Sequence, residues 1–502
     1  MTTRSCWLVP FCVVSMLLTG CGQEDRPVAG QEAKRPTLLA DASWPSVVLI
    51  SIDALRPDHL HCYGYPKDTS PRIDQLADEG TLFEQAISSA PWTLPAHACL
   101  FTGLCDSVHG CTDTDRRLHG MHYTLAERLK DTGYATAGFF SSPYLHPTFG
   151  LRQGFDVYVG CTSHPELAEQ AIAETGTVES EGVWQAMRED VTGPKVVQEV
   201  VKWLQQNTRR PFFLFIHLSD PLFDYIPPPP YDTKFDPDYA GNITGRDFAS
   251  DPRINPDMGK RDLEHVQALY DGEIAWTDEN LGKILDELAS LNLLDSCIVM
   301  LTSGHGTGFF EHGLKGCRNS LFDELIRIPL IMRYPAQIPA GQRQTMQVRM
   351  IDLLPTVLDL LNMPLPQLMG QSLKPLFAGG EPAHGLEPAV SELLTLGQEA
   401  QSFRVPERKS LWDVRTDTGM VFDLVADPGE LAPLRDPQSP TVKRARVDSM
   451  WSRDFLKAFR QRHPQSPKSA EISPELLAQL RARWDVPPAE AEKPASQPAP
   501  AP

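Results

Sequence analysis

Two hydrophobic patterns alternate along most of the chain. Runs of β-branched and aliphatic residues at 47–52, 212–216 and 297–301 are typical of strands that are buried on both faces. A shorter run at 330–332 predicts a further strand. Strands of this kind belong to the interior of a sheet that other elements cover on both sides.

Helical patterns lie between these runs. Ser70 and Pro71 favour the start of a helix, and Gly80 favours its end. A longer helical pattern covers 263–291. Because strands and helices alternate, we expect an α/β fold with a large, mostly parallel sheet flanked by helices.

The residues that follow the predicted strands are the first candidates for a functional site. Ligands of open α/β sheets bind beyond the carboxyl ends of the strands. Asp53 follows the first of the three long runs, residues 217–220 follow the second, and residues 303–305 follow the third. We therefore expect these three groups to lie at one edge of the sheet.

The pattern changes after about residue 375. Two short strand patterns, 412–414 and 421–424, flank Asp417-Thr418-Gly419, which is a hairpin signal. Ser473 and Pro474 predict a final helix that runs to Arg483. The chain thus divides into a catalytic-type α/β domain at 45–375, a small antiparallel subdomain at 376–486, and a Pro/Ala/Glu-rich tail at 487–502 that we expect to be disordered.

The first residues predict export and a lipid anchor. Arg4 precedes an apolar run at 7–18 that is too short to span a bilayer. Leu18-Thr19-Gly20-Cys21 resembles a bacterial lipobox, in which Cys21 becomes the lipidated N-terminus; an ordinary cleaved signal is the alternative. We expect a signal peptide at 1–21, a flexible tether at 22–44, and an exported bacterial lipoprotein held at a membrane, in the periplasm or at the cell surface.

The overall charge limits the partners. The chain has 502 residues and a formal net charge of −19. This charge argues against nucleic acid as a partner and against attraction to an anionic membrane surface. Affinity for a sulfate or phosphate must therefore come from a local feature, such as a metal ion or a helix N-terminus.

The cysteines suggest one disulfide. Three of the ten cysteines, Cys6, Cys12 and Cys21, lie in the signal segment. Of the other seven, Cys105 and Cys111 flank a short loop and could form a bridge in an oxidising compartment. No CxxC pair or His/Cys cluster in the sequence suggests a zinc site.

The segment 91–103 (PWTLPAHACLFTG) carries the most chemical information. Pro95 suits the first turn of a helix and Gly103 suits its end, so Thr93 lies at a helix N-terminus. The free N–H groups and the helix dipole favour an anion there. The Thr93 hydroxyl could attack a sulfur or phosphorus centre at this position, although a simple helix cap is the alternative.

Eight segments together resemble the sulfatase family, which belongs to the alkaline phosphatase superfamily, in their order and spacing. They are 49–60, 61–64, 93–103, 270–282, 302–313, 321–329, 351–361 and 422–430. The resemblance implies an alkaline phosphatase-like mixed sheet between helices, followed by a smaller C-terminal sheet. It also implies hydrolysis of sulfuric esters by a nucleophile at the start of the central helix, beside a divalent cation held by carboxylates.

Several residues match the site that this resemblance implies. Asp53 matches the first metal carboxylate, and His305 still offers a nitrogen ligand, so we predict Asp53, Thr93 and His305 as metal ligands. Thr93 stands where sulfatases carry the Cys or Ser that becomes formylglycine. A threonine cannot form that aldehyde, but it can act directly, as in phosphodiesterase-like relatives. His97, in place of an Arg, and His217 are further predicted catalytic residues.

Other positions depart from the family pattern. Ala54 and Gly304 replace two metal carboxylates, and Leu222 replaces a His. Cys317 stands at a position that is usually His or Lys, and the nearby Lys315 is predicted to take that catalytic role. Ca²⁺ and Mg²⁺ prefer several carboxylate oxygens, whereas Zn²⁺ and Mn²⁺ accept mixed ligands. Any of these four remains a candidate, and Asp220 or Asp224 could complete the site.

Two functions follow from these observations. The first is hydrolysis of sulfuric or phosphoric esters by Thr93 at an altered metal site. The second is a catalytically inactive protein that keeps the fold and acts in surface binding or as a scaffold. The substrate, a small or polymeric ester that includes sulfated ones, would be selected by the inserted loops at 155–195 and 222–262.

Overall fold

A computed structural model describes most of the chain. The described residues are 44–163, 191–222, 224–385, 387–395, 397–463, 467–468, 472–474, 476–477 and 479–480, and all of them belong to the unit Leu38–Pro502. The expected signal peptide, tether and tail, most of the loop at 155–195 and much of the expected final helix lie outside the described residues.

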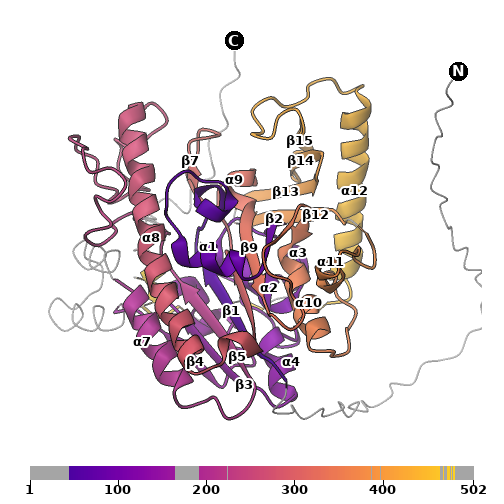
Figure 1. Ribbon diagram of the computed structural model, residues 1–502. Coiled ribbons are helices and arrows are strands. Elements are labelled where there is room, and N and C mark those ends of the chain that lie inside the picture. The colour runs from indigo at the N-terminus through magenta and orange to yellow at the C-terminus, as the bar shows by residue number, and fades with distance from the viewer. Residues whose placement is uncertain are drawn as a thin grey trace, which may run out of the picture. The chain divides into compact units, whose positions relative to one another are not determined.

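The larger sheet is mixed and mostly parallel, as predicted (Figure 1). Its central strand, β1 (Ser46–Ile52), is buried along its whole length and pairs in parallel with β5 (Phe212–Leu218) and β6 (Cys297–Thr302). β9 (Arg327–Arg333) is antiparallel to β6 and to β2 (Thr81–Ile87). The strand order in this sheet is β10-β2-β9-β6-β1-β5-β3-β4. The bounds of the outer strands are β3 (Ala135–Phe140), β4 (Val157–Gly160) and β10 (Gln342–Gln344). A further short strand, β11 (Val348–Arg349), pairs with β2.

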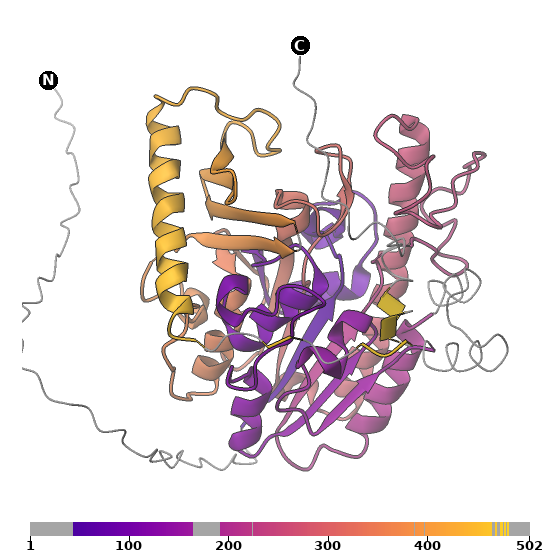
Figure 2. The ribbon, with the colours of Figure 1, turned by 180° about the vertical axis from the view of Figure 1, so that it is seen from behind.

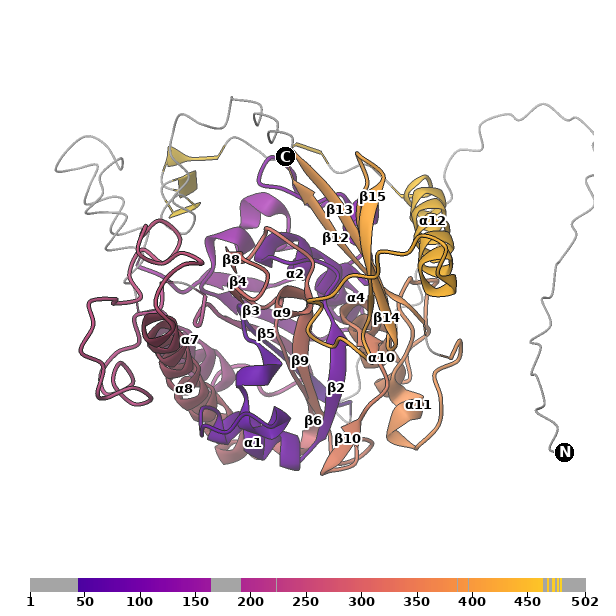
Figure 3. The ribbon, with the colours of Figure 1, turned by 90° about the horizontal axis from the view of Figure 1, so that it is seen from above.

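Helices cover both faces of this sheet (Figure 3). On one face lie α1 (Pro71–Asp78), α7 (Gly193–Leu204) and the long α8 (Lys260–Ser290), which contacts both. On the other lie α2 (Thr93–Thr102), α4 (Leu125–Asp131) and α10 (Leu353–Leu360). The four strands and three helices predicted in this part of the chain are confirmed, with ends shifted by a few residues.

Shorter elements complete this part of the chain. They are α3 (Asp106–His109), α9 (Asp323–Ile326), α11 (Lys374–Phe377), the two-stranded ribbon β7 (Gly308–Phe309) and β8 (Lys315–Gly316), and 3-10 turns at Pro57–His59, His61–Tyr63, Pro143–Leu145, Pro147–Phe149, Leu294–Ser296 and Met350–Asp352.

A smaller antiparallel sheet follows, as predicted (Figure 2). It consists of β12 (Ala389–Thr395), β13 (Gln398–Val405), β14 (Arg408–Asp413) and β15 (Thr418–Asp423) in sequence order. The predicted hairpin is β14–β15. The 21-residue helix α12 (Pro440–Arg460) contacts β13 and β14, and sequence analysis did not predict it.

A buried cluster of charges joins the small sheet to the larger domain. Lys409 of β14 is fully buried, with its Nζ 2.8 Å from Asp323 Oδ1 at the start of α9 and 2.7 Å from Glu430 Oε1. Arg404 of β13 donates to the other oxygen of Asp323 at 2.9 Å. Burial opposes ionisation of Asp323, but Lys409 and Arg404 outweigh it and hold the pKa of Asp323 below its usual range.

Two further findings concern the cysteines and the membrane. Cys105 and Cys111 are free thiols, so the predicted disulfide is wrong for this structure. The reason is local: Cys105 precedes α3, while Cys111 Sγ turns toward the carbonyl oxygen of Phe149 at 3.9 Å. Among the described residues, every helix is too short or too polar to cross a bilayer.

Replacement of Lys409 tests the buried cluster. Lys409→Met leaves Asp323 and Glu430 buried with one cation fewer, so we expect the free energy of unfolding to fall by about 3–5 kcal/mol in urea titrations. Lys283→Met is the matched control, because Lys283 is half exposed and pairs with Glu279 on the same helix face. That control is expected to change stability by less than about 1 kcal/mol, and equal effects of the two variants would contradict the role of the cluster.

Candidate active site

The start of α2 brings a hydroxyl to the carboxyl edge of the large sheet. Thr93 is the first residue of α2, after an extended Trp92, and Pro95 lies in the first turn. Gly103 ends the helix with φ +69°, a left-handed conformation that favours glycine. The helix boundaries predicted from 91–103 are therefore confirmed.

The residues that surround this hydroxyl lie on or just after three strands. Asp53 directly follows β1, and His305 lies three residues after β6. His217 is on β5, where it pairs with Ser51 of β1. Because β5 and β6 flank β1 in parallel, the ends of these strands meet at one place.

The three predicted metal ligands converge. Thr93 Oγ1 donates a hydrogen bond to Asp53 Oδ2 at 2.9 Å. His305 Nε2 lies 3.3 Å from Thr93 Oγ1 and 3.1 Å from Asp53 Oδ1. The exposed fraction is 2% for Thr93 and 0% for the other two, so the group lies out of contact with bulk solvent.

The tautomer of His305 leaves a lone pair facing this group. His305 Nδ1 lies 2.7 Å from the carbonyl oxygen of Gly306, which can only accept, so Nδ1 carries the proton. In the neutral ring Nε2 is then unprotonated, and it faces Asp53 Oδ1, which receives no hydrogen bond from the described residues. A backbone carbonyl that fixes one imidazole nitrogen while the other faces a carboxylate is typical of a metal-ligating histidine.

His217 lies on the other side of the carboxylate. Its Nε2 is 3.4 Å from Asp53 Oδ2, and neither ring nitrogen has a well-aligned hydrogen bond with any described residue. Burial raises the pKa of Asp53, but the positive charge and hydrogen bonds of His305 and His217 in their protonated forms outweigh burial and hold it well below its usual range. Asp53 is therefore an anion at working pH, and its neutral form is not available as an acid.

His97 is held away from the Thr93 hydroxyl. Its Nδ1 donates to the carbonyl oxygen of Thr93 at 2.7 Å, and its Nε2 accepts from Ser51 Oγ at 2.9 Å. Burial, with a smaller effect from His217, lowers the pKa of His97 to about 3. The ring is thus neutral and ties the first turn of α2 to the central strand, which makes His97 a positioning residue in this arrangement.

The His97 ring also occupies space beside Gly304. A Cβ at Gly304 would lie 3.1 Å from His97 Cε1 and 3.5 Å from Ala96 Cβ. A carboxylate at position 304 therefore does not fit unless His97 moves. Ala54, the other position that lacks the family carboxylate, is fully buried in a left-handed conformation with φ +55°.

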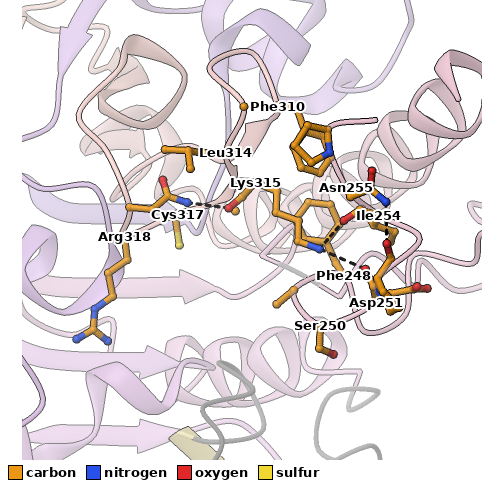
Figure 4. A pocket seen from close by; sticks show the side chains of 16 residues that line it. Phe248, Ser250, Asp251, Ile254, Asn255, Phe310, Leu314, Lys315, Cys317 and Arg318 are labelled. Carbon is orange, nitrogen blue, oxygen red and sulfur yellow. Dashed lines mark hydrogen bonds between the residues drawn. The ribbon is translucent and has the colours of Figure 1, made fainter. Parts of the chain in front are cut away.

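Lys315 points into a neighbouring cavity of about 610 Å³ (Figure 4). Its Nζ donates to the carbonyl oxygen of Ile254 at 2.7 Å and lies over the ring of Phe248, so it holds the inserted loop. Cys317 lines the same cavity, and burial together with the charge of Asp53 raises its pKa. The cavity walls include Lys315 and Cys317 but not Thr93, Asp53 or His305.

Sequence reasoning missed the cation beside the start of α2. The Arg318 guanidinium lies 4.1 Å from the centre of the Trp92 ring and donates to Asp113, while the Arg318 N–H donates to the carbonyl oxygen of Pro91. Arg318 directly follows Cys317, the position that sequence analysis compared with the His or Lys of the family.

The expected third carboxylate does not join the group. Within the described residues, three or more His, Cys, Asp or Glu ligand atoms come together once, at Cys99, Asp106 and His109. Asp224 Oδ1 instead accepts from the N–H of Phe248 at 2.8 Å and holds the inserted loop. Neither Asp220 nor Asp224 therefore completes a site with Asp53 and His305.

The Cys99–Asp106–His109 cluster escaped sequence analysis, because its members come together only through the fold. His109 Nδ1 accepts the N–H of Cys111 at 3.0 Å, so Nε2 carries the ring proton and has no lone pair for a metal. Cys99 Sγ donates to Asp106 Oδ1 at 2.9 Å. Burial raises the pKa of Asp106 and lowers that of His109 to about 3, so the cluster is a neutral hydrogen-bonded core.

Two solved structures show the same fold as this chain. A structure of BT4656 in complex with its substrate D-glucosamine-2-N,6-O-disulfate superposes with a TM-score of 0.67 over 84% of this chain and 99% of that chain, at 20% identity. The phosphonate monoester hydrolase of Agrobacterium radiobacter superposes with a TM-score of 0.67 over 83% of this chain and 96% of that chain, at 21% identity.

The sequence match identifies the family. A model of the Sulfatase family matches residues 45–363, and the chain therefore belongs to the sulfatase family. It is similar to a ulvan-active sulfatase of Formosa agariphila, with 26% identity over 434 residues that cover 83% of this chain and 80% of that protein.

Members of this family are typically metal-dependent, which makes the ligand set informative. Among the described residues, Asp53 is the one carboxylate beside Thr93 and His305, whereas a hard cation prefers several carboxylate oxygens. A cation that accepts mixed ligands fits the facing lone pairs of Asp53 Oδ1 and His305 Nε2, with the Thr93 hydroxyl as a third donor.

The packing of His97 against Gly304 can be measured by a double-mutant cycle. Gly304→Ala places a methyl group against the His97 ring, so we expect it to lower the free energy of unfolding by about 1–3 kcal/mol. In a His97→Ala background the same change should be milder, with a coupling of about 0.5–3 kcal/mol. The backbone of Gly304 is not left-handed, so the expected loss of stability comes from the contact with His97 and not from backbone strain. Additive effects in thermal unfolding would disprove the contact.

Proposed function

We propose that the protein is a hydrolase of sulfuric or phosphoric esters in which Thr93 is the nucleophile. The observation that carries this proposal is the convergence of Thr93 Oγ1, Asp53 and His305 within 2.9–3.3 Å of one another. The proposal also rests on membership of the sulfatase family. Thr93 acts as an oxygen nucleophile in its own right, because a threonine cannot supply the aldehyde of other sulfatases.

The residues have separate roles in this proposal. Asp53 accepts the Thr93 hydrogen bond and aims the hydroxyl oxygen, and His97 fixes the backbone carbonyl of the same residue. The N–H groups at the start of the ten-residue α2 point toward the oxygens of a bound ester and stabilise their charge. Asp53 is a weak base, since its pKa is held well below the usual range, and it cannot deprotonate Thr93 alone.

The proposed chemistry would also use a divalent cation. Asp53 and His305 would hold Zn²⁺ or Mn²⁺, with Thr93 beside it. When bound, such an ion lowers the pKa of a coordinated hydroxyl and neutralises ester oxygens. His217, with two ring nitrogens that lack well-aligned partners among the described residues, is placed to hydrogen-bond the substrate or the leaving group.

The location and substrate are part of the same proposal. Cys21 would carry the lipid that holds the exported chain at a membrane, with the substrate outside the cytoplasm. Names of similar proteins include a ulvan-active sulfatase and a complex with a glucosamine disulfate, which supports a sulfated ester, small or polymeric, as the substrate. The fold shared with a phosphonate monoester hydrolase supports esters of phosphorus acids, the group to which phosphoric esters belong, as the second class.

A second candidate function is that of a catalytically inactive binding or scaffold protein. The burial of Thr93 favours it, because 2% exposure leaves little room for an ester to approach. The separation of the 610 Å³ cavity from Thr93, and the filling of the space beside Gly304 by His97, favour it as well. In this case the fold would persist after the loss of the metal.

Replacement of the nucleophile tests the hydrolase proposal. Thr93→Ala removes the attacking oxygen, so turnover of an aryl sulfate and an aryl phosphate should fall by about 10³-fold or more, while Thr93→Ser retains part of it. Thr102→Ala is the matched control on the same helix, because its hydroxyl bonds the carbonyl oxygen of Ala98. Undiminished turnover in Thr93→Ala, after repeated purification, would remove Thr93 from the mechanism.

Metal content separates the two candidate functions. The full chain is purified without chelator and its metals are measured by mass spectrometry. We expect about one equivalent of zinc or manganese, which Asp53→Asn and His305→Ala each reduce to background. Less than about a tenth of an equivalent of any divalent metal, together with no turnover, would favour the inactive protein.

A further inference from the structure

The cavity beside Lys315 lies between the inserted loop and the β7–β8 hairpin (Figure 4). Residues 248–256 of the loop form one wall, and residues 310–319 form the other. Its volume of about 610 Å³ falls in the range that is usual for small-molecule sites in proteins. Because Thr93, Asp53 and His305 do not line it, this cavity is separate from the candidate active site.

Both walls of the cavity present apolar side chains. Phe248 and Ile254 of the loop are buried, and the Phe248 ring is held by Tyr225, with ring centres 4.8 Å apart. Phe310 and Leu314, in the turn of the hairpin, line the opposite wall. Walls of this kind favour a ligand with an apolar ring, which gains free energy when it leaves water.

One cation points into this apolar space. Lys315 Nζ donates to the carbonyl oxygen of Ile254 at 2.7 Å and lies 3.5 Å from that of Asp251. Among the described residues, no carboxylate lies within ion-pair distance of this ammonium group. Burial lowers the pKa of Lys315, so a negative group beside it would favour its charged form.

The other charges of the cavity wall have counter-ions. Asp251 Oδ2 lies 2.6 Å from Arg253 Nη2, and the Arg318 guanidinium lies 2.5 Å from Asp113 Oδ1. Asp251, Lys315 and Arg318 are the charged residues that line the cavity. Lys315 is therefore the one charge of this wall without a counter-ion in the described part of the chain.

We infer that this cavity binds a small organic anion that combines an apolar ring with one anionic group. Lys315 binds the anionic group, and Phe248 and Phe310 contact the ring. A neutral ligand would leave the ammonium group without a counter-ion, and a ligand with several charges would find one cation for all of them. The inference does not depend on hydrolysis at Thr93, because that residue lies outside the cavity.

Three probe compounds separate the contributions of the ring and the charge. The first is 2-naphthalenesulfonate, which has both and is not an ester. The second is 2-naphthol, which keeps the ring without the charge at neutral pH, and the third is isethionate, a sulfonate without a ring. In calorimetric titrations of the full chain, we expect 2-naphthalenesulfonate to bind at one site and at least about tenfold more tightly than either of the others.

Two variants locate this binding in the cavity. Lys315→Met removes the ammonium group and keeps an unbranched apolar side chain, so the affinity for 2-naphthalenesulfonate should fall at least about tenfold, while that for 2-naphthol stays the same. Phe310→Ala removes a ring from the wall and should lower the affinity for both naphthalene compounds at least about threefold.

Two control variants should leave the affinity unchanged. Lys234 is the matched lysine, because its Nζ lies 5.0 Å from the Phe235 ring centre, as that of Lys315 lies 5.5 Å from the Phe248 ring centre, but it lies outside the cavity. Lys234→Met therefore tests for a general effect of charge. Thr93→Ala tests whether the anion binds at the candidate active site instead, and thermal unfolding checks that each variant is folded.

Any of three results would overturn the inference. The first is no binding of 2-naphthalenesulfonate at millimolar concentration, and the second is equal affinity of the native chain and Lys315→Met for it. The third is loss of binding in Thr93→Ala, which would assign the anion to the candidate active site. Turnover of esters does not enter this measurement, so the result stands apart from the outcome for the proposed hydrolysis.

Discussion

A buried carboxylate without a cationic side chain beside it is the constraint on which the site depends. Asp53 lies at the end of the central strand with no contact with solvent, and a charge in that position must be neutralised by its neighbours. Two imidazoles and one hydroxyl surround it, and none of the three is a permanent cation. The negative charge of the Asp53 carboxylate therefore remains to be neutralised, which a proton or a metal ion can do.

The departures from the sulfatase pattern are connected in space. Gly304 and His97 are 207 positions apart along the chain, yet the ring of one takes the space that a side chain of the other would need. Ser51 of the central strand also takes part, since its hydroxyl donates a hydrogen bond to the same His97 ring. Two positions at which the chain departs from the expected family pattern therefore touch each other, and His97 ties the start of α2 to the central strand.

The sequence predicted what depends on local patterns, and it failed where contacts are distant. The strands β1, β5 and β6, the bounds of α2 and the β14–β15 hairpin follow from periodicity and turn residues. The role of His97 and the Cys99–Asp106–His109 cluster depend on side-chain directions that only the fold fixes. Helix α12 was not predicted, because exposed residues such as Trp451 and Phe455 obscure the periodicity of the small residues that pack on the small sheet.

Positions 54 and 304, where the resemblance to the family led us to expect carboxylates, differ in how easily they could accept one. Position 54 has a left-handed backbone, which Asp tolerates better than most residues, so a single substitution is compatible with the local geometry. At position 304 a side chain would meet the His97 ring, which would have to shift to make room for it. A carboxylate could therefore be introduced at position 54 without disturbing its neighbours' backbone, whereas at position 304 it would have to be accompanied by a movement of the imidazole.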